Sequence, residues 1–432
     1  MRISYYALGC KVNEYEAAAV INQFLERGYR LVDFDEESDV CIINTCTVTA
    51  VSDAKSRKLI RQAIRRNPAA VIAVMGCFAQ LNPGTVSRIP GVDIVIGTSE
   101  RHMLVELVEK CLREKQACCL VSSVNNLHAY EELKIDKYIS RVRGFVKIED
   151  GCDNFCSYCA IPYARGRVRS RAVADVIAEI KRLVASGIRE VVLTGINTAA
   201  YGADLKDYSF ANLLEDIFTQ VPDLYRLRIS SIEIAEITDE FLTTIARHRD
   251  RFCPHLHIPL QGGTDRILAL MNRKYTTTAY AEKLAKIREL FPGINITTDV
   301  MVGFPGETEE DFAQARDFIE SMNFGEMHIF PYSPRPRTKA AAFTGQVSPE
   351  AKKARVRALL ELNRVQALRY REQFVGQVLP VIVEKVAGGI TYGHSGNYLE
   401  ISFPGADAEI NSVQSVRLTR AAYPLSRGEV DV

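Results

Sequence analysis

The chain has 432 residues and a nearly balanced charge, with 54 Lys and Arg against 53 Asp and Glu. Hydrophobic residues make up 47% and charged residues 25%, which is typical of a folded globular protein and excludes a disordered polyelectrolyte. No stretch approaches the roughly 18 uninterrupted apolar residues of a membrane span, and the first residues resemble a strand more than a secretion signal. We therefore expect about three domains, no membrane partner and a cytoplasmic location.

The first 125 residues alternate short apolar runs with amphipathic stretches. The runs are predicted as buried strands because they are short and mostly end at small or polar residues. They are Ile3–Leu8, Val40–Asn44, Val71–Met75 and Asp93–Ile96, with helices such as Glu16–Arg27 and Ala54–Arg66 between them. This alternation predicts a parallel α/β domain over residues 1–125, with helices on both faces of the sheet.

The alternation resumes after a polar linker that we place at residues 126–143. The spacing of six further strands suits βα units that close into a full or partial barrel, here a partial (βα)6 barrel over residues 144–370. The strands are Phe145–Ile148, Glu190–Leu193, Leu227–Ser231, His255–Pro259, Ile296–Val302 and Met327–Tyr332. A long amphipathic helix, at about Pro349–Phe374, follows them.

Residues 371–432 change in character to short strands that are separated by GG, SGN and PG turns. Such a pattern predicts a small antiparallel β-barrel. The expected strands are Val378–Val386, Ile390–Tyr392, Tyr398–Phe403 and Val416–Ala421.

Eleven cysteines are unusual in a chain without an export signal, because the cytosol keeps thiols reduced. Cys152, Cys156 and Cys159 lie in GCDNFCSYC, directly after the first barrel strand, with C-x3-C-x2-C spacing. Three thiolates on one loop can hold three irons of a [4Fe–4S] cluster and leave the fourth iron open. Zinc is the alternative, but it would bring a fourth ligand at close spacing, and the nearest downstream histidine is His248.

Cys10, Cys46 and Cys77 each stand just past the end of a predicted strand. Since the ends of parallel strands meet at one edge of a sheet, these residues can converge. We interpret them as ligands of a second cluster, the alternative being three separately buried thiols. The other cysteines are assigned to packing or surface: Cys41, Cys111, Cys118, Cys119 and Cys253.

Eight segments along the chain resemble the methylthiotransferase family of the radical S-adenosylmethionine (SAM) superfamily. They are LGCKVNEYE, INTCTVT, MGCFAQ, GCDNFCSYCAIPYARGRVRSR, LTGIN, RISSIE, HLHIPLQGG and DVMVGFPGETEEDF. The resemblance spans the chain and implies a cluster domain, a radical SAM barrel and a C-terminal TRAM barrel. It also implies two [4Fe–4S] clusters and SAM as cofactors: one cluster cleaves SAM to a 5′-deoxyadenosyl radical, and the other holds the sulfur that is inserted.

By the same resemblance, SAM contacts are expected at the carboxyl ends of the barrel strands. Tyr158 is expected against the adenine and the TGIN segment against the methionine end of SAM, whereas a structural turn is the alternative for the Gly-rich segments. The family usually has QSGS where this chain has LQGG, which puts a hydroxyl contact there in doubt. The expected cofactor contacts are Tyr158, Arg165, Thr194, Gly195, Asn197, Ser231, Glu233 and Gln261.

Four basic runs indicate a nucleic-acid partner, although solvated faces are the alternative for any single run. The runs are Lys55–Arg66, Arg165–Arg171, Arg335–Lys339 and Lys352–Arg357. Together with the family resemblance they predict tRNA as the substrate and, by implication, an electron donor such as flavodoxin or ferredoxin.

The segments LGCKVNEYE and NTCTVT most resemble those of one branch of the family. That branch methylthiolates C2 of N6-threonylcarbamoyladenosine at position 37 of tRNAs reading ANN codons. One alternative is the N6-isopentenyladenosine branch, which more often has a GCQMN-like segment, and another is methylthiolation of an aspartyl residue of a ribosomal protein. A cobalamin-dependent radical SAM enzyme is disfavoured because no D-x-H-x-x-G motif occurs near the N-terminus. A simple iron–sulfur electron carrier would not need the six-stranded unit.

Overall fold

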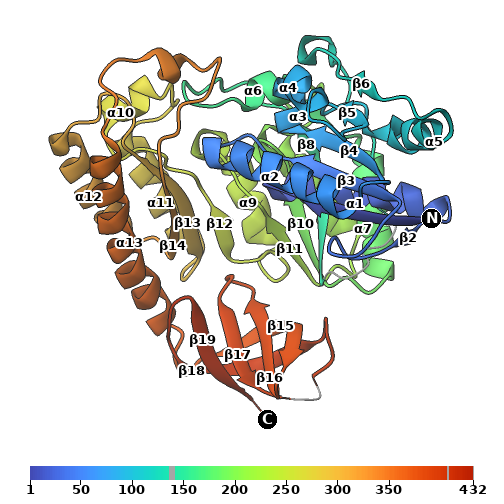
Figure 1. Cartoon of the computed structure of the whole chain (residues 1–432). Helices are drawn as coiled ribbons and strands as arrows, with labels where there is room; N and C mark the ends of the chain where they lie inside the picture. The colour runs from blue at the N-terminus through green and yellow to red at the C-terminus, as the bar shows by residue number, and fades with distance from the viewer. Residues whose placement is uncertain (136–141, 406–407, 432) are drawn as a thin grey trace.

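The structure is a computed structural model that describes residues 1–135, 142–405 and 408–431 (Figure 1). Its N-terminal domain is built on a six-stranded parallel sheet. Residues 136–141 of the expected linker lie outside the described residues. The strand order is β2-β1-β3-β4-β5-β6. The strands are β1 (Arg2–Ala7), β2 (Arg30–Leu31), β3 (Val40–Thr45), β4 (Val71–Gly76), β5 (Ile94–Ile96) and β6 (Cys118–Leu120).

Helices cover both faces of this sheet because its central strands are apolar on both sides. Val40 and Ile42 of β3 pack against α1 (Lys11–Glu26) and α5 (Leu104–Glu114). Cys41 and Ile43 point to the opposite face, toward α2 (Ala50–Arg66), α3 (Cys77–Leu81) and α4 (Pro83–Ser87). The predicted parallel α/β domain is therefore confirmed.

The second unit is the predicted partial barrel. Two parallel three-stranded sheets, β11-β10-β7 and β12-β13-β14, are joined by the single bridges Leu227–Phe252 and Ser231–His257. No pairing between β7 and β14 occurs among the described residues, so the barrel stays open on that side. Its strands are β7 (Arg143–Lys147), β10 (Glu190–Thr194), β11 (Arg226–Ile229), β12 (His255–His257), β13 (Asn295–Val302) and β14 (Glu326–Pro331).

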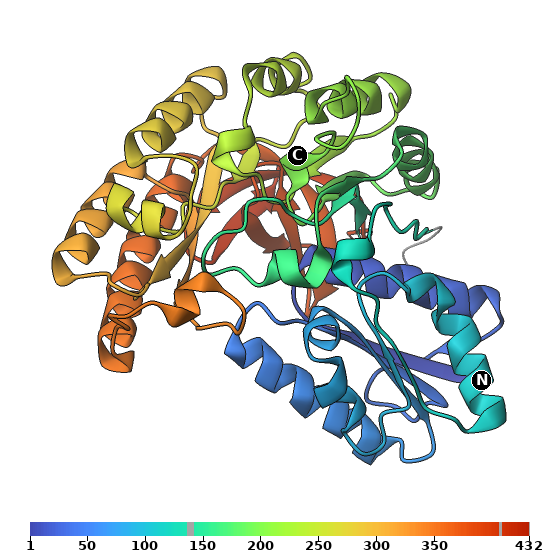
Figure 2. The same cartoon turned by 90° about the horizontal axis from the view of Figure 1, so that it is seen from above.

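Helices surround the barrel on its outer side, and the N-terminal domain lies across the open side (Figure 2). The outer helices are α7 (Val173–Ala185), α8 (Phe210–Gln220), α9 (Asp239–Arg247), α11 (Thr277–Leu290), α12 (Glu309–Met322) and α13 (Pro349–Glu372). A two-stranded hairpin of β8 (Glu149–Asp150) and β9 (Arg169–Ser170) encloses α6 (Ile161–Arg165), and α10 (Asp265–Leu270) follows β12. No helix among the described residues is both long enough and apolar enough to cross a bilayer.

The C-terminal unit is a closed five-stranded barrel in the order β15-β16-β17-β19-β18. Its strands are β15 (Val378–Ala387), β16 (Ile390–Ser395), β17 (Glu400–Pro404), β18 (Val413–Arg420) and β19 (Leu425–Val430). The β17–β19 pair is parallel, which differs from the all-antiparallel expectation, because the unexpected strand β19 closes the barrel. This barrel docks at the beginnings of the strands of the partial barrel, where Arg226 Nη2 donates to the His394 carbonyl at 3.0 Å and Asn295 Nδ2 to the Asn397 carbonyl at 2.8 Å. The domain limits at 125 and 370 stay predictions.

Candidate active site

The loop between β8 and α6 carries Cys152, Cys156 and Cys159 at the carboxyl end of β7. All three are free, partly buried thiols. Burial raises the pKa of the Cys159 thiol to about 12, and the nearby charge of Cys156 contributes to the rise. Arg273 Nη1 lies 3.5 Å from Cys156 Sγ and supplies a positive charge beside the loop. A cation at this place favours thiolates, the form that binds iron.

The N-terminal thiols converge at the carboxyl edge of the sheet. Cys10 precedes the first residue of α1, Cys46 follows β3, and Cys77 begins α3. Burial raises the pKa of the Cys46 thiol, and the charge of Cys77 raises it further. The charge of Cys10 likewise raises the pKa of Cys77, and the charge of Cys46 raises the pKa of Cys10. The three thiols therefore lie within electrostatic range of one another.

Glycine makes this approach possible. Gly9 has φ +104°, and a Cβ at that position would stand 2.9 Å from Cys46 Sγ. Gly76, directly before Cys77, has φ +96°, and a Cβ there would overlap the Asn44 side chain. Only glycine adopts such backbone angles without strain. The GC pairs of the sequence therefore allow the chain to turn and to present each thiol at the sheet edge.

The two sets of thiols lie within electrostatic range of each other, because the charge of Cys77 contributes to the raised pKa of Cys159. In the part of the chain that the structure describes, neither set has its three sulfurs within 4.8 Å of one another. Zn–S bonds of about 2.3 Å would hold sulfurs about 3.8 Å apart in a tetrahedral site. A [4Fe–4S] cluster spreads its ligands over a larger body, so both thiol sets fit it better than a single ion.

Arg165 joins the N-terminal domain to the barrel. Its guanidinium donates to Glu16 Oε1 at 2.6 Å, to Asp150 Oδ1 at 3.1 Å and to Asn13 Oδ1 at 2.7 Å, and its Nε lies 3.3 Å from Cys77 Sγ. The side chain is 0% exposed. The expected SAM contact at this residue stays a prediction, since all of these contacts are made with the protein itself.

Further cations complete this buried network. Lys147 Nζ donates to Glu16 Oε1 at 2.7 Å and to Asp150 Oδ2 at 2.6 Å, and Arg101 pairs with Glu16. Burial alone would raise the pKa of Glu16, but Arg101, Arg165 and Lys147 lower it to about 2. The same balance of burial against cations holds the pKa of Asp150 below its usual range. Both carboxylates are therefore ionised at neutral pH.

The SAM-contact candidates of the TGIN segment surround Glu149. The Asn197 backbone N–H donates to Glu149 Oε1, and Asn197 Nδ2 donates to Glu236 Oε1 at 2.6 Å. A Cβ on Gly195 would overlap the Glu149 carboxyl group. Burial raises the pKa of Glu149 well above its usual value, and its Oε2 has no hydrogen-bond partner among the described residues. Thr194 is buried at the end of β10.

The other candidates come from the cysteine loop and from the segments that follow β11 and β12. Tyr158 packs with its ring edge toward Phe304, at 6.5 Å between centroids, and Arg273 pairs with Glu233. Gln261 has φ +65°, and its buried Oε1 has no partner among the described residues. Ser231 is half-buried beside β12, to which it forms a single β-bridge. The unpartnered oxygens of Glu149 and Gln261 fit a polar ligand such as SAM, because buried polar groups normally have partners.

The sequence reasoning missed several residues of this region. Glu149 and Asp150 directly precede Gly151 and Cys152 of the cysteine loop. Two acidic residues beside a cluster motif could have marked them as part of the site. Arg273 and Glu16 gave no local signal, because their partners are distant in sequence. Their positions became evident only from the folded chain.

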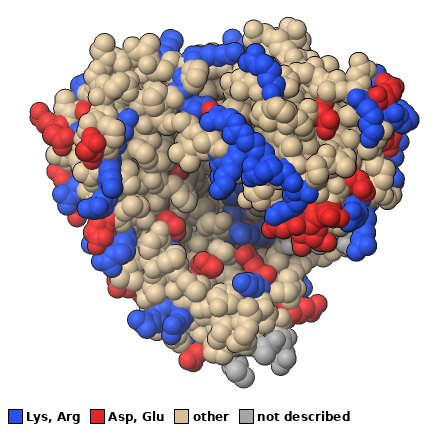
Figure 3. All heavy atoms as spheres, in the orientation of Figure 1, with Lys and Arg blue, Asp and Glu red and all other residues tan. Residues whose placement is uncertain are grey.

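The expected basic runs divide into buried and exposed parts. Arg169, Arg171, Arg335 and Arg355 are buried, so these members of the runs contribute no nucleic-acid surface. Each donates hydrogen bonds to oxygen atoms of the protein. Arg335 Nη2, for example, donates to Asp53 Oδ2 at 2.6 Å. Arg167, Arg337, Lys339, Lys353 and Arg357 of these runs are exposed, and on α2 basic residues form a band above a hollow in the molecular surface (Figure 3). The exposed cations of α2 are Lys55, Lys58, Arg61, Arg65 and Arg66.

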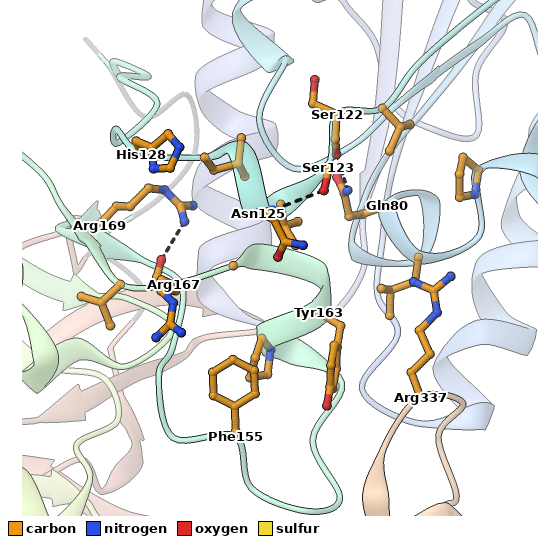
Figure 4. Close-up of a pocket in the computed structure, with 18 of the residues that line it drawn as sticks. Gln80, Ser122, Ser123, Asn125, His128, Phe155, Tyr163, Arg167, Arg169 and Arg337 are labelled. Carbon is orange, nitrogen blue, oxygen red and sulfur yellow. Dashed lines mark hydrogen bonds between the residues drawn. The ribbon is translucent and has the colours of Figure 1, made fainter.

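A cavity of about 1010 Å³ lies beside the cysteine loop, between the N-terminal domain and the barrel (Figure 4). Its lining includes Phe155 and Tyr163, whose rings meet edge-on at 6.1 Å between centroids, together with Arg167 and Arg337. Aromatic faces beside guanidinium groups suit the stacking of unpaired bases and contact with phosphates.

Comparison with known proteins agrees with this geometry. The chain matches the Radical SAM superfamily over residues 146–319 and the Uncharacterized protein family UPF0004 over residues 2–97. It is 43% identical over 432 residues, which is 99% of this chain and 96% of the relative, to "Threonylcarbamoyladenosine tRNA methylthiotransferase MtaB" of Bacillus subtilis (strain 168). It is 38% identical over 436 residues, 98% of this chain and 96% of the relative, to "tRNA-2-methylthio-N(6)-dimethylallyladenosine synthase" of Moorella thermoacetica.

Among solved structures, the radical SAM methyltransferase TsrM from Kitasatospora setae has a TM-score of 0.59 and 17% identity. The match covers 90% of this chain and 80% of that one, and it shows a shared fold. The full-length similarity to the curated relatives shows the family, which brings with it an iron–sulfur cluster and SAM. The chain therefore belongs to the tRNA methylthiotransferase family of radical SAM enzymes.

Proposed function

We propose that the protein methylthiolates C2 of N6-threonylcarbamoyladenosine at position 37 of tRNAs reading ANN codons, with two [4Fe–4S] clusters and SAM. The observation that supports this most is the meeting of two sets of three thiols, near enough for the charge of Cys77 to act on Cys159. The threonylcarbamoyl substrate is taken from the relative in Bacillus subtilis, to which the chain is similar over its whole length.

In this proposal Cys152, Cys156 and Cys159 hold the cluster that binds SAM, while Cys10, Cys46 and Cys77 hold the second cluster. When bound, the first cluster would supply the electron for SAM cleavage, and the second would supply the sulfur for methylation. Three protein ligands leave one iron of each cluster free for these tasks. The electron donor is proposed to be a flavodoxin or a ferredoxin.

The chain's own residues orient the reactants and exclude water. Glu149, whose pKa burial raises well above its usual value, offers an unpartnered carboxyl oxygen toward the SAM region, and Gln261 offers an amide oxygen. The buried pairing of Arg165 with Glu16 and Asp150 fixes the distance between the two domains that carry the thiols. The proposed roles of Thr194, Asn197 and Ser231 follow from their places at the carboxyl ends of the barrel strands.

The anticodon loop is proposed to bind over the cysteine loop, with Phe155 and Tyr163 stacking on unpaired bases. Phe155 is well suited to this, because it is 38% exposed on the loop that carries the thiols. The band of exposed cations on α2 is then positioned for phosphate contacts. The adenine is then flipped out of the loop into the barrel, as in other enzymes that act on a base.

Two measurements test this proposal. Anaerobically reconstituted protein is expected to hold about eight irons per chain, and Cys46→Ala should hold about half while it still cleaves SAM reductively. Zinc in place of iron would contradict the two-cluster proposal. Mass spectrometry of tRNA nucleosides from a deletion strain should show loss of the 2-methylthio group with the threonylcarbamoyl group retained. If the 2-methylthio group is kept on threonylcarbamoyladenosine but lost from isopentenyladenosine, the result instead favours the function named for the Moorella relative.

A further inference from the structure

Three nitrogen atoms without partners gather near the beginnings of the barrel strands. The Lys11 ammonium makes no hydrogen bond or ion pair among the described residues. Arg228 Nη1 and His255 Nδ1 are buried and also without a partner there, and Arg228 is 1% exposed. Buried polar groups without partners are rare in folded proteins, so the Arg228 and His255 atoms call for a ligand, whereas the Lys11 side chain is only partly buried.

The three groups belong to one neighbourhood although they come from different domains. The charges that act most strongly on Lys11 are those of Tyr398, Arg143 and Arg228. The Arg228 guanidinium lies 4.5 Å from the centroid of the Tyr398 ring, and His255 stacks on the same ring at 4.8 Å. Lys11, at the start of α1, therefore lies within electrostatic range of this group of barrel residues.

Positive charge exceeds negative charge in this neighbourhood. Arg226 and Arg228 share the single carboxylate of Glu190, with Arg228 Nε to Glu190 Oε1 at 2.8 Å. Arg143 pairs with Glu384 at 3.2 Å, and that carboxylate also faces His394 at 3.0 Å. Further along the strands, Asp299 is paired with His257 at 3.3 Å. The Lys11 ammonium is left without a balancing carboxylate.

We propose that Lys11, Arg228 and His255 form a subsite for an anionic group of the substrate, and that this group is the carboxylate of the threonylcarbamoyl side chain. The inference rests on the proposed function. Lys11 directly follows Cys10, so the subsite begins one residue from a thiol of the N-terminal set. A five-residue strand such as β7 is about 16 Å long, so a base held at the thiols can extend its N6 substituent along the barrel interior toward Lys11 and Arg228, with the His255 imidazole beside them.

The charge balance favours an anion over a metal ion in this part of the barrel. His257, Asp299 and His328 bring three ligand atoms within 4.8 Å of one another, which resembles a metal site. However, His257 Nδ1 already faces Thr297 Oγ1 at 2.9 Å, and its Nε2 faces Asp299. The surplus of cations nearby would also repel a metal ion, whereas it would attract a carboxylate.

The test compares anticodon stem–loops that differ only at adenosine 37. One carries the threonylcarbamoyl group, one carries its methyl ester, and one is unmodified. Affinity is measured by fluorescence anisotropy with anaerobically purified, SAM-loaded protein whose iron content has been determined. The variants are Lys11→Met and the charge-preserving Lys11→Arg, with Lys181→Met as the matched control, because Lys181 is an exposed lysine on α7.

The wild-type protein is expected to bind the carboxylate loop about tenfold more tightly than the ester loop, because a charge-assisted hydrogen bond is lost on esterification. Lys11→Met should abolish this preference, whereas Lys11→Arg and Lys181→Met should retain it. A preference that survives in Lys11→Met overturns the subsite and leaves the proposed function standing. Equal weakening of all three loops also overturns it, since Lys11 would then contact a backbone phosphate. A wild-type protein that does not distinguish the carboxylate loop from the unmodified loop overturns the proposed function itself.

Discussion

Replacing Arg165 with methionine should destabilise the junction between the N-terminal domain and the barrel. The change keeps an unbranched apolar stem and removes the guanidinium. Glu16 Oε2 then loses its hydrogen bond from Arg165 Nη2 at 3.0 Å, and Asn13 Oδ1 loses its donor at 2.7 Å. Each buried group left without a partner costs about 1–3 kcal/mol. Two such groups give a loss of about 2–6 kcal/mol, in the range of about 3–5 kcal/mol found when buried ion pairs are broken.

Arg167 provides a matched control from the same ARGRVRSR segment. Its side chain is 76% exposed and pairs with Asp153 at 3.2 Å. Exposed ion pairs contribute about 0–1 kcal/mol, so Arg167→Met should change stability by less than about 1 kcal/mol. The assay is urea unfolding of the reduced, metal-free proteins, with the first transition compared among wild type and the two variants. If Arg165→Met unfolds within about 1 kcal/mol of wild type, the buried network does not hold the domains together as described.

Three further changes test other parts of the structure. Because the folded pKa of Glu16 is lowered to about 2, its stabilisation is complete above pH 4.5 and is lost as the pH falls toward 2. Acid titration of the metal-free wild type should show the free energy of unfolding fall by about 3 kcal/mol over this range. A Glu16→Gln variant whose free energy of unfolding falls as steeply would disprove the assignment of this loss to Glu16. Gly195→Ala should weaken SAM binding, measured by equilibrium dialysis, because the new methyl group displaces Glu149; unchanged binding would separate this turn from the SAM site. Replacing both Lys58 and Arg61 with alanine should reduce the slope of log affinity against log salt for tRNA by about 1–2, and an unaltered slope would exclude α2 from the RNA surface.

Local sequence patterns were sufficient for the elements of the fold. Apolar runs of about five residues between amphipathic stretches gave β1, β3, β4 and β5 within one or two residues. Two short strands, β2 and β6, were missed because they form the two edges of the sheet and contain no buried residue. Strand β19 was missed for a similar reason, since LSRGEV has little apolar character and is held in place by its neighbours.

The spacing of Cys152, Cys156 and Cys159 and the order of the motifs by themselves predicted which loop binds iron and which chemistry it suits. Thiolate chemistry depends on residue type and on close spacing along the chain, both of which are written in the sequence. Only the tertiary structure decided what the charged residues do. Arg165 and Arg167 are two positions apart in one basic run, yet one is enclosed by Glu16 and Asp150 and the other faces solvent. The reason is that the partners of a buried charge come from distant segments, which meet only after the domains have packed.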